Sequence, residues 1–156
     1  MSTLKAQLRA DLTAAMKARD ELVKSTLRMT LTAIGTVEVA GTEARELSDD
    51  EVLKVIAKEA KKRAESAEAF AAAGRDELAA QERAEGVILD RYLPTQLSDD
   101  ELAAIARTAV DETATELGEQ PGPRQMGKVM KRANAAAAGR ADGGRVAVAV
   151  KALLAG

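Results

Sequence analysis

Two copies of the sequence Leu-Ser-Asp-Asp-Glu, at residues 47–51 and 97–101, constrain the fold of this chain more than any other feature. In each copy the serine is predicted to cap a helix, and the glutamate three residues later completes a capping box. The aspartates between them suit the positive end of the helix dipole. The leucine before each serine can pack on Val52 or Leu102 as a hydrophobic staple. Clustered carboxylates also suit a metal site, but four agreeing capping signals favour two helix starts.

Hydrophobic side chains recur at every third or fourth position along nearly the whole chain, a spacing typical of amphipathic helices. Helices are predicted over residues 4–16, 20–41, 48–73, 76–92, 98–117, from Pro123 to a loop at 139–144, and over 145–154. In the fourth helix the predicted buried residues are Leu78, Ile88, Leu89 and Tyr92. In the last segment Val146, Val148 and Val150 alternate as in a strand, but no second strand is available, so a helix is preferred.

Because every predicted element is a helix, the sequence predicts an all-α fold. Pro94 disfavours the helical conformation at Leu93 and marks a boundary. We therefore expect a larger N-terminal helical domain over residues 1–94 and a small C-terminal helical domain over residues 95–156.

The residue types that are missing exclude several kinds of chemistry. Without cysteine or histidine the chain has no disulfide, no Cys/His zinc site and no histidine-based catalytic triad. No metal or other cofactor is predicted. No run of about 18 apolar residues is present, so no membrane span is predicted. Residues 1–16 are charged throughout and do not resemble a signal peptide, so a cytoplasmic location is expected.

The formal net charge of −2 hides a strong asymmetry along the chain. Residues 121–156 hold seven basic side chains and one acidic side chain, a formal charge of +6. The other 120 residues hold sixteen basic and twenty-four acidic side chains, a formal charge of −8. Such a separation predicts an anion-binding surface near the carboxyl end. The candidate nucleic-acid-binding residues are Arg124, Lys128, Lys131, Arg132, Arg140 and Arg145.

The spacing of these residues supports a common surface. The first four recur at intervals of three to four and are predicted to lie opposite the apolar face of their helix. Pro123 is expected to open that helix and to leave free N–H groups beside Arg124. Arg140 and Arg145 flank a glycine-rich loop whose amides can approach a phosphate. Since aromatic residues are nearly absent, we expect binding by phosphate contact and shape rather than by base stacking. The alternative is a solvated basic face that only balances the acidic remainder.

Further basic residues lie on the predicted helix at 48–73, namely Lys58, Lys61, Lys62 and Arg63. Glutamates are interspersed with them, so ion pairs within one helix are the simpler explanation. Lys24 and Arg28 are interpreted in the same way.

No catalytic constellation is visible. Residues 122–128 match the first seven positions of a phosphate-binding P-loop, but Val129 stands where serine or threonine binds magnesium. Pro123 removes an amide from such a loop, and no strand precedes it. Gly127 is better explained as a point where another helix or a partner's backbone comes close. Since no serine has an evident base, no catalytic residue is predicted and the chain is not expected to be an enzyme.

Several segments together resemble the GatB/YqeY family. They are residues 15–17 (Ala-Met-Lys), 27–29 (Leu-Arg-Met), 55–63, 92–94 (Tyr-Leu-Pro), 126–130 (Met-Gly-Lys-Val-Met) and 141–154. The resemblance covers essentially the whole chain in the right order. It implies an all-α fold with a larger N-terminal and a smaller C-terminal helical domain.

In the glutamine-dependent aminoacyl-tRNA amidotransferase, a similar module forms the tail of the B subunit and helps to hold the tRNA body. The resemblance therefore implies that the basic residues from Arg124 to Arg140 face tRNA or another structured RNA. The family label of carbon–nitrogen ligase activity, with glutamine as amide donor, belongs to the larger enzyme. This chain resembles the tail alone, without the ATP-using portion, so that activity is expected only by association. The main alternative is a protein–protein adaptor that docks on an enzyme without contacting nucleic acid.

Overall fold

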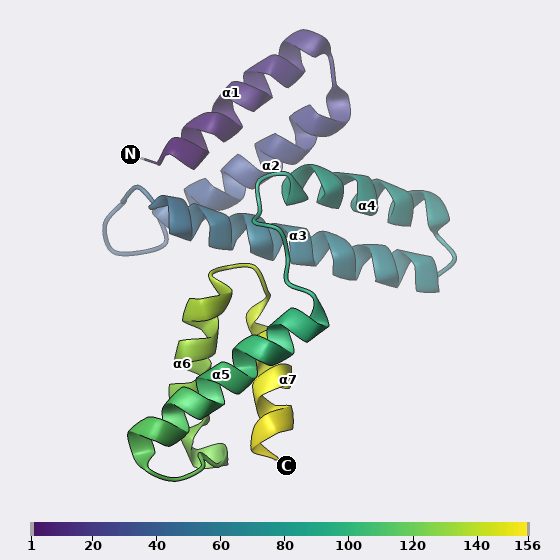
Figure 1. Ribbon diagram of the computed structural model, residues 1–156. Helices are drawn as coiled ribbons and strands as arrows, with labels where there is room; N and C mark the ends of the chain where they lie inside the picture. The colour runs from purple at the N-terminus through teal and green to yellow at the C-terminus, as the bar shows by residue number, and fades with distance from the viewer. Residues whose placement is uncertain (1, 156) are drawn as a thin grey trace. The chain divides into compact units, whose positions relative to one another are not determined.

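The computed structural model describes residues 2–155, which form seven α-helices and one short 3₁₀ helix, η1 (Figure 1). Their bounds are α1 Thr3–Ala18, α2 Glu21–Glu38, α3 Asp49–Ala72, α4 Asp76–Asp90, α5 Asp99–Leu117, η1 Pro123–Gln125, α6 Met126–Ala137 and α7 Gly143–Leu154. No β-strand occurs within residues 2–155, so the predicted all-α fold is confirmed. Contacts divide the chain into two compact units, Met1–Leu93 and Pro94–Gly156. That each folds as a separate domain stays a prediction.

Both predicted capping boxes are formed. The Ser48 hydroxyl oxygen accepts a hydrogen bond from the Glu51 amide, and the Glu51 carboxylate accepts one from the Ser48 amide, both at 3.3 Å. Ser98 and Glu101 form the same reciprocal pair at 3.1 and 3.2 Å. Hydrogen bonds from Ser98 lower the pKa of Glu101. The leucine before each serine is buried, as a hydrophobic staple requires. These carboxylates therefore serve as helix caps.

The N-terminal unit is built from two helical hairpins, α1–α2 and α3–α4, whose apolar faces form one core (Figure 1). Buried residues of all four helices and of the segment before α3 contribute: Leu8, Leu27, Ile34, Leu47, Val52, Ile56, Ile88 and Leu89. The prediction for the fourth helix was correct for Ile88 and Leu89 but wrong for Leu78, which is 38% exposed. Ala79 and Glu85 are buried instead, because α4 turns these residues toward α3.

A buried ionic cluster joins α3 to α4 around Arg63, whose side chain is only 16% exposed. Its guanidinium lies 3.3 Å from Glu59 on α3, and 3.7 and 3.3 Å from Glu82 and Glu85 on α4. Glu85 is buried, with 7% of its side chain exposed. Buried carboxylates need such a partner because transfer of an isolated charge out of water is very unfavourable. This cluster explains how four charged residues lie within an otherwise apolar helix contact.

A second polar contact ties the start of α1 to the start of α3. Asp49, the first residue of α3, accepts hydrogen bonds from the hydroxyls of Ser2 and Thr3 at 2.6 and 2.7 Å, and from the Leu4 amide at 3.1 Å. Ser2 in turn caps α1 by accepting from the Lys5 amide. These bonds, the one from Ser2 first, lower the pKa of Asp49 to about 2. One carboxylate of α3 thus completes the start of α1.

This contact predicts a pH dependence of stability. The folded-state pKa of Asp49, about 2, lies below its ordinary value of 3.8, so its contribution is fully present above about pH 4 and is lost as the pH falls toward 2. We expect Asp49→Asn to lower the melting temperature at pH 6, with a difference from wild type that shrinks by pH 2. Thermal denaturation at several pH values measures this. Asp50→Asn, which removes a neighbouring exposed carboxylate outside these bonds, should leave the melting temperature nearly unchanged. A pH-independent difference for Asp49→Asn would contradict the prediction.

The C-terminal unit is a three-helix arrangement in which α6 and α7 both pack on α5 and on each other. Its buried core is rich in small side chains: Leu97, Leu102, Ala106, Ala109, Val110, Val129, Ala133, Ala137, Val146 and Val150. Alanine at the contact surfaces lets the helix backbones approach closely. The last segment is a helix, as predicted. Val146 and Val150, four residues apart, are buried in the core, whereas Val148 between them is 70% exposed. In a strand all three would share one face.

Candidate nucleic-acid interface

The basic helix starts differently from the prediction. Pro123 opens the 3₁₀ helix η1, and α6 begins only at Met126. The Gly122 amide is taken by the Gln125 side chain at 2.8 Å. Pro123 thus opens a helical turn, as expected, but this turn is 3₁₀ rather than α, and Gln125 already takes the Gly122 amide. That an amide beside Arg124 receives a phosphate stays a prediction.

Three of the six predicted residues form one exposed row, which we name the α6 stripe: Arg124, Lys128 and Lys131. The three side chains are exposed, whereas Val129 and Ala133 on the other side of the helix are buried. Lys128 and Lys131, three residues apart, share one face of α6, and Arg124 stands just before that helix, in η1. Within residues 2–155 no side chain forms an ion pair or hydrogen bond with any of the three. Residues 126–137 include no acidic side chain, so the stripe keeps its full charge.

Arg132 does not belong to this exposed row, although the sequence placed it there. Its guanidinium donates to the Thr113 hydroxyl at 3.0 Å and forms a short ion pair with Glu116, both on α5. Arg132 lies on the side of α6 that faces α5, and its side chain reaches from one helix to the other. Arg132 therefore holds α6 to α5, and the prediction that it projects with the other three is wrong.

Arg140 and Arg145 lie at the opposite end of the unit. Arg140 donates to the carbonyl oxygens of Ala136 and Ala137, which caps the end of α6, and its charge helps to lower the pKa of Glu101. Arg145 pairs with Asp99 at 2.8 Å. Both arginines thus lie beside the acidic first turn of α5, and the six residues do not form a single basic patch. Whether Arg140 and Arg145 contact a nucleic acid stays a prediction.

The glycine-rich loop is less open to phosphate than its sequence suggests. Asp142 caps α7, and its carboxylate accepts a hydrogen bond from the Gly144 amide at 2.8 Å. An amide that was expected to face a phosphate is therefore taken by a negatively charged side chain of the same loop. Gly127 was expected to allow close approach of a helix, but a Cβ atom at this position would meet no other element within 4 Å. Any close contact at Gly127 would have to come from a partner.

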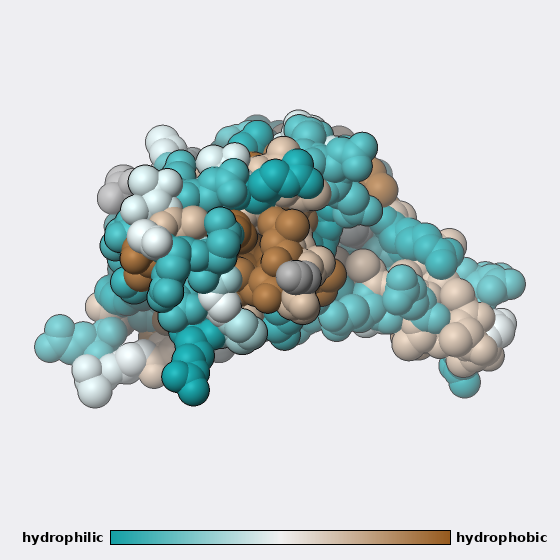
Figure 2. All heavy atoms as spheres, turned by 60° about the horizontal axis from the view of Figure 1, so that its bottom comes forward, coloured by the Kyte–Doolittle hydropathy of each residue, from teal (hydrophilic) through white to brown (hydrophobic). Residues whose placement is uncertain are grey.

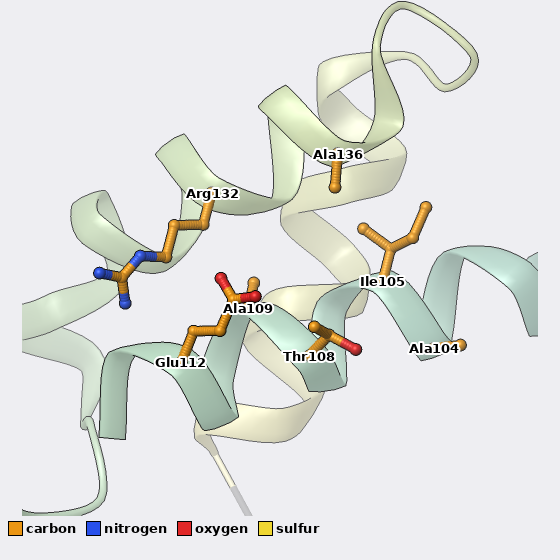
Figure 3. Close-up of a pocket in the computed structure, with 7 residues that line it drawn as sticks. All are labelled: Ala104, Ile105, Thr108, Ala109, Glu112, Arg132 and Ala136. Atoms are coloured by element: carbon orange, nitrogen blue, oxygen red, sulfur yellow. The ribbon is translucent and has the colours of Figure 1, made fainter. Parts of the chain in front are cut away.

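A shallow hollow of about 210 Å³ lies between α5 and α6 (Figure 3). It is lined by Ala104, Ile105, Thr108, Ala109, Glu112, Arg132 and Ala136. In Figure 3 Arg132 and Glu112 lie toward one end of the hollow, and Ile105, Thr108 and alanines line the rest. The hollow is smaller than the roughly 300–1,000 Å³ typical of small-molecule sites. Its one guanidinium is already bonded to Thr113 and Glu116, so the hollow offers little for recognising a small ligand.

Fold and surface define this protein as an all-helical protein that presents one row of basic side chains on a short helix of its C-terminal unit. The chain matches the YqeY family, described as Yqey-like protein, over residues 5–154. It belongs to this family, and the resemblance seen in its sequence segments is confirmed.

Two fungal proteins are similar to the chain, and both bear the name altered inheritance of mitochondria protein 41, mitochondrial. The protein from Meyerozyma guilliermondii is 30% identical over 124 residues, which is 78% of this chain and 64% of that protein. The protein from Clavispora lusitaniae is 35% identical over 101 residues, 64% of this chain and 58% of that protein. The chain thus spans less than two thirds of the length of either relative. Within residues 2–155 no helix is long and apolar enough to cross a membrane.

Proposed function

We propose that this protein binds structured RNA, with tRNA as the first candidate, through the α6 stripe, and that it performs no chemistry of its own. The observation that carries the proposal is the row of three exposed cations without partners among residues 2–155, two of them on α6, which has no acidic residue. Such a row can contact neighbouring phosphates of one backbone. The family resemblance supplies tRNA as the candidate, and a cytoplasmic location remains part of the proposal.

The test is a titration of bulk tRNA followed by fluorescence anisotropy at several salt concentrations. With three phosphate contacts, the logarithm of the association constant should fall against log salt with a slope of about −2.7 or steeper. This corresponds to about 40-fold weaker binding at 200 mM than at 50 mM salt. Lys128→Glu combined with Lys131→Glu should reduce the slope by about 2 and weaken binding to all sequences alike.

The matched control is Arg83→Glu combined with Arg107→Glu. These exposed arginines lie on α4 and α5, outside the stripe, and their replacement changes the net charge by the same amount. Binding should stay within a few-fold of wild type. If wild-type protein does not bind tRNA at low salt, or if both double variants lose the same affinity, the stripe is not an RNA-binding surface.

A docking role on another protein is the second candidate, and the exposed apolar residues of α7 favour it. Val148 and Leu153 are 70% and 37% exposed. Figure 2, in which the lower end of Figure 1 faces the viewer, shows hydrophobic residues at the surface among hydrophilic ones. Association that survives nuclease and high salt, and that Val148→Asp abolishes, would support this role. Loss of association on nuclease treatment would favour RNA.

A further inference from the structure

The α6 stripe has a counterpart with the same spacing on α3. Residues 124–132 read Arg-Gln-Met-Gly-Lys-Val-Met-Lys-Arg, and residues 54–62 read Lys-Val-Ile-Ala-Lys-Glu-Ala-Lys-Lys. Both place cations at the first, fifth, eighth and ninth positions and a very small residue at the fourth. We name the exposed row of this second segment, Lys54, Lys58 and Lys61, the α3 stripe. Each unit of the protein thus carries one stripe.

The structure separates the lysines of α3 into two groups. Lys62 and Arg63 are held by glutamates, since both contact Glu59 and Arg63 also contacts α4. Ion pairing within the fold, the simpler explanation of this basic segment, therefore holds for those two. It does not hold for Lys54 and Lys58, which are exposed and form no ion pair or hydrogen bond with another side chain of the described residues 2–155.

The α3 stripe lies on the solvent side of its helix. Val52 and Ile56, on the other side, are fully buried in the core. The short Ala57 stands beside Lys58, as Gly127 stands beside Lys128, so no bulky side chain separates either row from an approaching backbone. Acidic residues bound the α3 stripe one turn before Lys54 and one turn after Lys61, at Asp50 and Glu65. This stripe therefore offers fewer phosphate contacts than the α6 stripe.

We propose that the α3 stripe is a second phosphate-contacting surface, so that the protein grips one RNA duplex backbone at two places, one with each unit. The proposal rests on the proposed RNA binding by the α6 stripe. Only residues 94–98 connect the last turn of the first unit to α5. Once the α6 stripe is bound, the α3 stripe meets the same RNA at a high effective concentration, so a row of two or three lysines that is weak alone adds measurably to affinity.

The ligand class follows from the chemistry of the two rows. Both consist mainly of lysines, which recognise phosphate as point charges, and neither contains an aromatic side chain for base stacking. Two separate rows need a backbone that is regular and long enough to reach both. A double-stranded RNA stem meets this need, whereas one mononucleotide or a very short stem occupies a single row.

Binding to two stem-loops, one with a stem of about 6 base pairs and one with about 24, tests the proposal, because a row of three side chains spans only a few base pairs of an RNA stem. For wild type on the long stem we expect at least about 10-fold tighter binding and a salt slope steeper by about 2 than on the short stem. Lys54→Glu with Lys58→Glu should remove this gain on the long stem and leave the short stem within about two-fold. Circular dichroism verifies that the variant is folded.

The outcomes distinguish failure of the α3 stripe as a second contact from failure of RNA binding as a whole. If the α3 variant binds the long stem as wild type does, and only the α6 variant fails, the second surface is absent and the α6 stripe stands alone. If the α3 variant loses equal affinity on both stems, the effect is general electrostatics rather than a second contact. If wild type binds neither stem at low salt, the proposed RNA binding itself fails. The pair Arg83→Glu and Arg107→Glu again controls for net charge.

Discussion

Arg63→Met is expected to lower the free energy of unfolding of the N-terminal unit by about 3–5 kcal/mol. The substitution keeps most of the apolar stem but removes the guanidinium that contacts Glu59 and Glu85. Those carboxylates are then buried without a close positive partner. Lys62 still contacts Glu59 at 3.4 Å, but because its side chain is 55% exposed, this ion pair offsets little of the lost stabilisation. Urea denaturation, followed through amide signals of residues in α3 and α4, measures the loss.

Lys62→Met is the matched control for this cluster. It removes the neighbouring cation of the same helix, whose exposed ion pair contributes at most about 1 kcal/mol. Adding Glu85→Gln to Arg63→Met should restore part of the stability, because it removes one of the unpaired charges. Equal stability of the two methionine variants would show that the cluster does not hold α3 against α4.

Val146→Asp is expected to unfold the C-terminal unit, with a loss of at least about 4 kcal/mol, because it places an unpaired carboxylate in the apolar core. Val146 is fully buried among residues of α5, α6 and α7. Val148→Asp, the same change two residues later, should stay within about 0.5 kcal/mol because Val148 faces solvent. The pair discriminates a helix from a strand, in which both positions would share one face.

Amide spectra of the two variants supply the readout. In Val146→Asp the signals of α5, α6 and α7 should collapse to the unfolded range, while those of α1 to α4 keep their positions if the first unit folds separately. Collapse of the whole spectrum would contradict the predicted division of the chain into two domains. Equal effects at positions 146 and 148 would contradict the helix itself.

The local features of this fold were predictable because short-range signals agree with one another. Each capping box combines four independent preferences within six residues, so no distant contact has to be known. The last helix was harder, since the alternation of valines fits a strand, and the absence of a pairing strand decided the matter. For Arg63 the expected pairing within its own helix is only part of the answer, because two of its three carboxylate partners lie on α4.

The errors concern contacts between helices. Leu78 was expected to be buried because it is apolar, but the orientation of α4 also satisfies Glu85, whose partner Arg63 lies 22 positions earlier in the chain. Arg132 could not be separated from Lys131 by spacing alone, because its partners Thr113 and Glu116 lie on another helix. Charge counting therefore located the basic region but could not tell cations that face solvent from those that join helices.

The link between Ser2 and Asp49 was missed, although serine before a helical segment is a recognisable cap. What could not be inferred is that the capping hydroxyl donates to a carboxylate 47 positions away. Only the packing of α1 beside α3 brings them together. Hydrogen bonds between a hydroxyl and a distant carboxylate have no characteristic residue spacing, so a sequence pattern does not predict them.

The bond from the Leu4 amide to the Asp49 carboxylate has a consequence for hydrogen exchange in the N-terminal unit. The Leu4 amide has its acceptor on another helix, so it stays open to solvent until α3 has formed its first turn. Deuterium uptake at this amide therefore reports on the assembly of residues far away in the chain. We expect exchange at the Leu4 amide to rise whenever α1 separates from α3, even where α1 itself stays helical.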